Sequence, residues 1–136
     1  MMAEILVDSN VLLDLITHDP VWYPWSSKTL EREGQGHALF INIAVYAEIS
    51  TSFARIEEVD AALADAGIGM RVISTEAAFL AGKCFVRYRR AGGTKASPLP
   101  DFFIGAQAAT DKTKLITRDA ARYRSYFPTV VLIAPP

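Results

Sequence analysis

The chain has 136 residues, of which 51% are hydrophobic and 21% are charged, which suits one globular domain and excludes a disordered chain. No apolar run approaches the ~18–20 residues needed to cross a bilayer, and the first residues lack the pattern of a signal peptide. The formal net charge is −1, and the single cysteine, Cys84, has no disulfide partner within the chain, which favours a reducing, cytoplasmic setting. We therefore expect one domain over residues 1–136 and no membrane segment.

In chain order, the pattern of apolar residues predicts a strand at 4–8, helices at 9–17 and 22–33, a strand at 38–42, helices at 43–53 and 55–66, a brief strand or irregular connection at 70–73, a helix at 75–90, a loop at 92–99, a helix at 100–110, a strand at 114–117, a helix at 120–126 and a strand at 129–133. Strands that alternate with helices pair in parallel, because parallel neighbours need a crossover connection. The predicted fold class is α/β, with a short parallel β-sheet covered by helices on both faces.

Charge is distributed unevenly along the chain. Residues 1–76 hold 12 acidic and 4 basic side chains, a net charge of −8, and residues 77–136 hold 3 acidic and 10 basic ones, a net charge of +7. No acidic residue occurs between Glu76 and Asp101, although five basic residues do. Such a basic segment either binds a polyanion or forms a solvated helix face, and the pattern by itself leaves both interpretations open.

Four acidic residues stand in apolar surroundings. Asp8 ends the first strand and Asp119 follows the strand at 114–117, so both belong at the carboxyl edge of a parallel sheet, where sites of α/β folds form. Glu48 lies on or beside an apolar helix face, and Asp101 opens a helix with apolar flanks. Each aspartate alone is explained by helix capping, and Glu48 by solvation or an ion pair. Gathered together, however, four carboxylates would repel one another, and Mg²⁺ or Mn²⁺ would remove that repulsion.

The motifs around these acids resemble, in the same order, those of PIN-domain nucleases. They read DSNVL at residues 8–12, IAVYAEI at 43–49, LPDFFIGAQA at 99–108, and LITRD at 115–119 followed by Tyr123. Together they span essentially the whole chain, and their order is more specific than any one of them. Among PIN-domain nucleases the chain looks most like the VapC-type toxins, although residues 22–25 match no family pattern.

The resemblance implies an endoribonuclease that depends on Mg²⁺ or Mn²⁺. Members of this family frequently form homodimers, and a cognate antitoxin blocks their active site. Asp8, Glu48 and Asp101 would hold the principal ion, and Asp119 would complete the site or hold a second ion. Attack by a metal-activated water would leave a 5′-phosphate and a 3′-hydroxyl.

Further residues are expected to support this site. Ser9, Asn10 and Thr117 either orient ligands and water or cap helices. RNA phosphates are expected to contact Arg87, Arg89, Arg90, Lys95, Arg118 and Arg122. The aromatic side chains of Trp22, Tyr23 and Trp25 either mark a dimer or antitoxin surface or pin the second helix to the core.

Other classes of protein share parts of this sequence pattern. Phosphoaspartyl receivers and haloacid-dehalogenase-like phosphatases also begin with a strand that ends in aspartate. The phosphatase pattern needs a second aspartate where this chain has Asn10, and the receiver pattern needs a late lysine that residues 127–136 lack. A PIN-fold module that binds RNA or protein without catalysis is the remaining alternative, and the four acids disfavour it because a binding module has no need for such a cluster.

Overall fold

The computed structural model describes residues 3–93 and 99–136, and strands alternate with helices along them. In chain order the elements are β1 (Glu4–Val7), α1 (Ser9–Ile16), α2 (Tyr23–Gly34), β2 (Ala38–Ile41), α3 (Ile43–Ser50), α4 (Ile56–Asp65), β3 (Ile68–Met70), α5 (Thr75–Arg90), α6 (Leu99–Asp111), β4 (Lys114–Ile116), α7 (Ala121–Tyr126) and β5 (Leu132–Ile133). Within the part of the chain that the structure describes, no helix has both the length and the apolar character needed to span a membrane.

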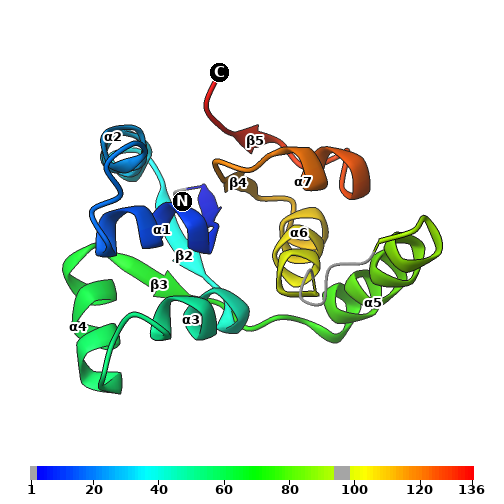
Figure 1. The fold of residues 1–136 in the computed structure, drawn as a ribbon, viewed down its shortest axis with the longest axis horizontal. Coiled ribbons are helices and arrows are strands. Elements are labelled where there is room, and N and C mark those ends of the chain that lie inside the picture. The colour runs from blue at the N-terminus through cyan, green and yellow to red at the C-terminus, as the bar shows by residue number, and fades with distance from the viewer. Residues whose placement is uncertain (1–2, 94–98) are drawn as a thin grey trace.

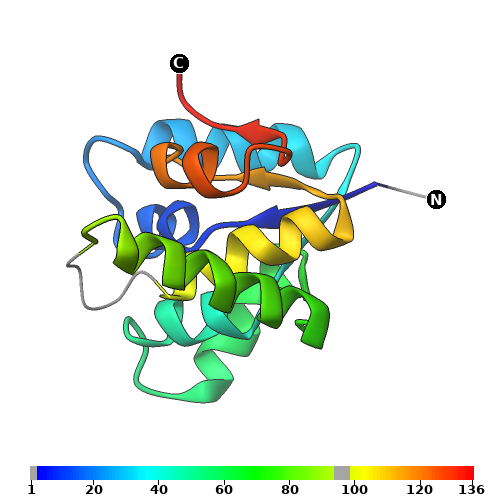
Figure 2. The same ribbon diagram turned by 90° about the vertical axis from the view of Figure 1, so that its right-hand side faces the viewer.

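The strands form one sheet in the order β3-β2-β1-β4-β5, and each neighbouring pair is parallel. Crossovers between parallel strands are right-handed, so the direction in which the chain moves across the sheet decides which face a helix covers. Figure 1 shows α1, α2 and α4 on one side of the strands and α5, α6 and α7 on the other. In Figure 2 the second group lies in front of the sheet. The predicted α/β fold with helices on both faces is confirmed.

β1 is the central strand, and its composition explains that position. Ile5, Leu6 and Val7 are fully buried, as expected for a parallel strand with helices on both of its faces. Leu6 pairs in register with Leu115 of β4. Asp8 therefore leaves the sheet at the same edge as the residues that follow β4.

β3 begins two residues earlier than the sequence pattern indicates. The sequence predicted a brief strand or an irregular connection at 70–73, whereas the strand covers Ile68–Met70. Only Ile68 of this strand is buried, and the apolar side chain of Val72 is exposed. Of the apolar side chains that suggested the later position, Met70 and Val72 are exposed and only Ile73 packs against the core.

Gly105 lets α6 approach the end of α7 closely. A Cβ atom at this position would lie 2.3 Å from Cδ2 of the Phe127 ring, and both residues are buried. We expect Gly105→Ala to lower the free energy of unfolding by about 1–3 kcal/mol in urea titrations, as overpacked core substitutions do. The matched control is Gly82→Ala in α5, where nothing lies within 4 Å, and which should stabilise the helix by about 0.5–1 kcal/mol. Equal stability of the two variants would contradict this packing.

Candidate active site

Asp8 lies at the carboxyl end of β1 and is only 2% exposed. Its Oδ2 atom accepts two hydrogen bonds of 2.8 Å, one from the hydroxyl of Thr117, which follows β4, and one from the hydroxyl of Tyr123 in α7. The backbone N–H of Asp8 donates to the carbonyl of Ile116 at 2.9 Å and extends the ladder between β1 and β4. The carboxylate is thus fixed in position by two neighbouring elements.

The surroundings of Asp8 disfavour its negative charge. Burial raises the pKa of this carboxyl from 3.8 to about 6, even though the hydrogen bonds from Thr117 and Tyr123 act in the opposite direction. The charges of Asp101 and Glu48 raise the pKa of Asp8 further. Burial also raises the pKa of the Tyr123 hydroxyl, and the charges of Asp8, Asp101 and Glu48 add to that effect. Three carboxylates are therefore close enough to act on one another.

Glu48 reaches the site from α3 and is linked to Asp8 through a serine. The hydroxyl of Ser9 donates to Oε1 of Glu48 at 2.9 Å and lies 3.3 Å from Oδ1 of Asp8. Burial raises the pKa of Glu48, the bond from Ser9 opposes this, and the charge of Asp101 adds to the rise. Asn42 is the N-cap of α3, and its side chain accepts a hydrogen bond of 3.0 Å from the backbone N–H of Val45.

Asp101 enters the site from the first turn of α6, and an arginine of α7 pairs with it. Nη1 of Arg122 forms an ion pair with Oδ2 of Asp101. The guanidinium of Arg122 also lies over the ring of Tyr88 in α5, 5.6 Å from the ring centroid. Asp101 is therefore shared between the acidic cluster and a basic partner.

Asp119 differs from the other three predicted acids because it is exposed. Its backbone N–H donates to the Thr117 hydroxyl at 3.1 Å, and its charge adds slightly to the rise in the pKa of Arg118 that a hydrogen bond to Asp14 mainly causes. It does not contribute to the pKa shifts of Asp8 and Glu48. As they stand, the described side chains include no group of three or more His, Cys, Asp or Glu residues arranged to hold a metal ion.

The residues expected to support the acids all lie beside Asp8. Ser9 has been described above, and the amide nitrogen of Asn10 lies 3.3 Å from both Oδ2 of Asp8 and the hydroxyl of Thr117. The side-chain oxygen of Asn10 accepts from the backbone N–H of Arg118 at 3.4 Å. These side chains contact the Asp8 carboxylate, and neither α1 nor α7 has a side-chain cap hydrogen bond at its N-terminus, so the geometry favours the orienting role over the capping role.

The PIN domain model matches residues 5–127 of this chain. The chain belongs to the PIN domain family. Its fold is similar to that of a chain in the Rickettsia felis VapBC2 structure bound to a promoter DNA fragment, with a TM-score of 0.72, 16% identity, and 98% of this chain and 99% of that one covered. For the VapBC-1 structure from nontypeable Haemophilus influenzae the TM-score is 0.70, with 17% identity and 96% and 97% covered.

A toxin–antitoxin complex from Klebsiella pneumoniae is also similar, with a TM-score of 0.64, 24% identity, and 93% of this chain and 95% of that one covered. No curated protein matches the chain at a significant level. At these identities the solved structures establish a shared fold, which agrees with the family assignment.

Asp14 is a buried acid of this PIN domain that the sequence analysis missed. It is 1% exposed, and the Arg118 guanidinium binds both of its oxygens, with Nε 2.9 Å from Oδ2 and Nη2 3.0 Å from Oδ1. The hydroxyl of Ser26 donates to Oδ2 at 2.7 Å. The position of Asp14 within the otherwise apolar pattern of α1 was the available signal. Arg118, which is predicted to contact RNA, joins the loop after β4 to α1 through this pair.

The segment 22–25 of the PIN domain, which matched no family pattern, lies next to the pair of Asp14 with Arg118 through Trp22. The Trp22 ring lies 5.5 Å from the guanidinium carbon of Arg118 and meets Trp25 edge to face with 6.5 Å between the ring centroids. Tyr23 stacks on the ring of His18 at 4.8 Å. Trp22, Tyr23 and Trp25 are partly buried, which favours the interpretation that they pin α2 to its neighbours.

The remaining predicted RNA contacts lie mainly at the end of α5. Arg87, Arg89 and Arg90 occupy its last turn and are exposed. Tyr88, in the same turn, contacts Phe102 at the start of α6 with 5.6 Å between the ring centroids. The basic end of α5 therefore borders the helix turn that carries Asp101. Lys95, the other predicted contact in this region, lies outside the described residues.

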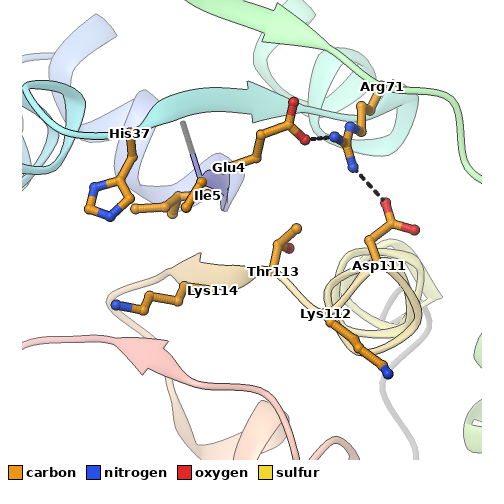
Figure 3. A pocket seen from close by; sticks show the side chains of 9 residues that line it. Glu4, Ile5, His37, Arg71, Asp111, Lys112, Thr113 and Lys114 are labelled. Carbon is orange, nitrogen blue, oxygen red and sulfur yellow. Dashed lines mark hydrogen bonds and ion pairs between the residues drawn. The ribbon is translucent and has the colours of Figure 1, made fainter. Parts of the chain in front are cut away.

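A hollow of about 460 Å³ lies at a different place on the PIN domain and is not part of this acidic cluster. Figure 3 shows Arg71 between Glu4 and Asp111, with ion pairs to both carboxylates. Glu4 and Lys114, which also line the hollow, begin β1 and β4, whereas Asp8 follows the other end of β1. Arg71 and its two acids form a charge-neutralising network that ties β1 to β3 and α6.

Proposed function

We propose that this PIN domain is a Mg²⁺- or Mn²⁺-dependent endoribonuclease and the toxin of a toxin–antitoxin pair. The observation that carries the proposal is the convergence of Asp8, Glu48 and Asp101 at the carboxyl edge of the sheet, where burial raises the pKa of Asp8 and of Glu48, the charges of Asp101 and Glu48 add to the rise at Asp8, and the charge of Asp101 adds to the rise at Glu48. The VapBC complexes among the structural neighbours support the toxin part. The buried thiol of Cys84 suits a cytoplasmic setting.

The chemistry of the acidic cluster fits a hard divalent cation. Its donors are carboxylate and hydroxyl oxygens, which Mg²⁺ prefers, and the mutual repulsion of buried carboxylates is relieved by bound positive charge. Asp8 and Glu48, which the hydroxyl of Ser9 links, would be ligands of the ion. Asp101 would exchange its bond to Arg122 for the ion, and the exposed Asp119 would complete the site or hold a second ion.

A bound ion would supply an activated water and neutralise charge on the phosphoryl oxygens, which leads to a 5′-phosphate and a 3′-hydroxyl. The chain's own residues set the geometry for this reaction. Thr117 and Tyr123 fix one oxygen of Asp8, and Ser9 holds Glu48. Such hydrogen bonds keep carboxylates in the orientation that a metal ion needs.

RNA would approach the site across the last turn of α5. We expect the triple variant Arg87→Gln, Arg89→Gln, Arg90→Gln to bind RNA more weakly and to show a smaller salt dependence, by about 0.7 in slope for each lost phosphate contact. Fluorescence anisotropy with a labelled single-stranded RNA at several salt concentrations measures both quantities.

A control for the loss of charge removes three exposed bases from other elements of the chain. It combines glutamine substitutions at Lys28, Arg32 and Arg55. This variant should keep the native salt slope. If both triple variants bind RNA with the same affinity and slope, the path along α5 is wrong.

We also propose that the chain forms a homodimer and binds a cognate antitoxin. An open apolar groove of about 690 Å³ between α3, α5 and α6 supports a protein partner near the acids. Ile43, Leu99 and Phe103 line it together with Glu48, and Ile43 is 62% exposed. Apolar area of this kind is covered more often by a protein partner than by water.

Thermal unfolding distinguishes the nuclease from a PIN-fold module without catalysis. Mn²⁺ should raise the melting temperature of the native chain, because an ion that binds only the folded state stabilises it. Asp8→Asn should remove most of this increase. An equal melting temperature with Mn²⁺ and with EDTA in the native chain would favour the binding module instead.

A further inference from the structure

Two consecutive residues of α7 engage two different acids of the site. Tyr123 donates to Asp8, and Arg122 forms an ion pair with Asp101. α7 therefore supplies a neutral hydrogen bond to one carboxylate and a full positive charge to another. Arg122 is predicted from the sequence to contact RNA, and its ion pair with an acid is an additional feature of the structure.

The guanidinium of Arg122 also contacts an aromatic cluster. Its guanidinium lies over the Tyr88 ring, and Tyr88 packs against Phe102 and Tyr126 at centroid distances of 5.6 and 6.2 Å. The Arg122 side chain remains 22% exposed, so it has access to solvent at the site. A cation held by a ring face and one carboxylate can change partners without leaving its place on α7.

We propose that Arg122 is an internal counter-ion that competes with the divalent cation for Asp101 and, once displaced, contacts a phosphate of the RNA. This inference rests on the proposed function. The guanidinium and a metal ion would neutralise the same carboxylate charge, so they compete for Asp101. A displaced Arg122 is repelled by the bound ion and attracted by a phosphate, for which its planar group is well suited.

This competition couples the binding of the cation to the binding of RNA. The cation frees Arg122 for a phosphate, and a phosphate that takes Arg122 leaves Asp101 available to the cation. Coupling between two ligands is reciprocal, so each raises the affinity for the other by the same factor.

The first test is calorimetric titration of the full chain with Mn²⁺ alone, in the native protein, in Arg122→Gln and in Arg124→Gln. Arg124 is an exposed arginine two residues along the same helix, so its variant loses the same charge without losing the ion pair. We expect Arg122→Gln to bind Mn²⁺ about three- to tenfold more tightly than the native chain, and Arg124→Gln to change much less. Arg122→Lys, which keeps the positive charge, should fall between Arg122→Gln and the native chain, and it replaces the glutamine variant if that one does not fold.

The second test measures the affinity for a single-stranded DNA oligonucleotide, which carries the same phosphates without being the proposed substrate. Mn²⁺ should strengthen binding more in the native chain and in Arg124→Gln than in Arg122→Gln. If the native chain binds Mn²⁺ and Arg122→Gln binds it equally or more weakly, the counter-ion role is overturned and the nuclease proposal stands. If neither the native chain nor any of the variants binds Mn²⁺, both the counter-ion proposal and the nuclease proposal are overturned.

Discussion

Asp8→Asn is expected to abolish metal-dependent cleavage of RNA and, in EDTA at pH 8, to make the protein more stable than the native chain. The substitution removes the negative charge of Asp8, which is a proposed ligand of the metal ion. It also removes a buried negative charge that the fold disfavours. Asparagine fits the space, because its oxygen can accept the bonds from Thr117 and Tyr123, and its amide can donate to Ser9 while Ser9 donates to Glu48.

The gain in stability should depend on pH in a defined direction. The pKa of Asp8 is raised from 3.8 to about 6, so the folded state disfavours the ionised form. Above pH 6 the ionised carboxyl of Asp8 therefore lowers the free energy of unfolding by about 3 kcal/mol. The figure corresponds to a pKa shift of roughly two units, each worth about 1.36 kcal/mol. The cost disappears as the pH falls through 6 towards 3.8, because the folded state then binds a proton that the unfolded state does not.

Urea titrations in EDTA at pH 8 and pH 5 measure this effect. Asp8→Asn should exceed the native chain in free energy of unfolding at pH 8, and the difference should shrink at pH 5. Asp119→Asn is the matched control, since Asp119 is exposed and should change stability little at either pH. An Asp8→Asn variant that is destabilised equally at both pH values, or that is folded and still cuts RNA, would contradict this account of Asp8.

The second large effect is expected at Asp14, where Asp14→Ala should lower the free energy of unfolding by about 3 kcal/mol. The substitution leaves Arg118 without its carboxylate partner and the hydroxyl of Ser26 without its acceptor. Removing one partner of a buried ion pair costs about 3–5 kcal/mol. We expect the lower end, because the Arg118 side chain is 29% exposed and can turn to water.

Urea titration of Asp14→Ala beside Asp65→Ala measures this cost. Asp65 is an exposed acid in the last turn of α4 and should contribute little. The double variant Asp14→Leu, Arg118→Met should recover much of the loss, since apolar residues of similar size replace both charges. A loss below about 1 kcal/mol in Asp14→Ala would mean that the pair with Arg118 is not a significant stabilising contact.

Much of the fold follows from local features of the sequence. The run Ile5, Leu6 and Val7 predicted a buried strand because a central parallel strand is apolar on both faces. Asp8 and Asp119 were placed at one edge because Asp8 ends one parallel strand and Asp119 follows another. The meeting of Asp8, Glu48 and Asp101 followed from the motif order and from the rule that sites form at this edge.

Other features depend on contacts between distant parts of the chain and were not predictable locally. The pair of Asp14 with Arg118 joins residues 104 positions apart, and its formation depends on how α1 packs against the loop after β4. The pair of Arg122 with Asp101 depends on how α7 docks on α6. β3 was placed two residues late because the exposed apolar residue Val72 resembles a strand position. Asp119 shares the sheet edge with Asp8, yet the loop leaves it exposed.

The cleavage of total RNA by the purified protein in Mn²⁺ and in EDTA, beside the variant Asp101→Ala, tests the central claim most directly. We expect RNA to be cut in Mn²⁺, with 5′-phosphate ends, and to remain intact in EDTA and with the variant. Cleavage that is the same in EDTA or with Asp101→Ala, or no cleavage by a native chain that binds Mn²⁺, would contradict a metal-dependent ribonuclease built on Asp8, Glu48 and Asp101.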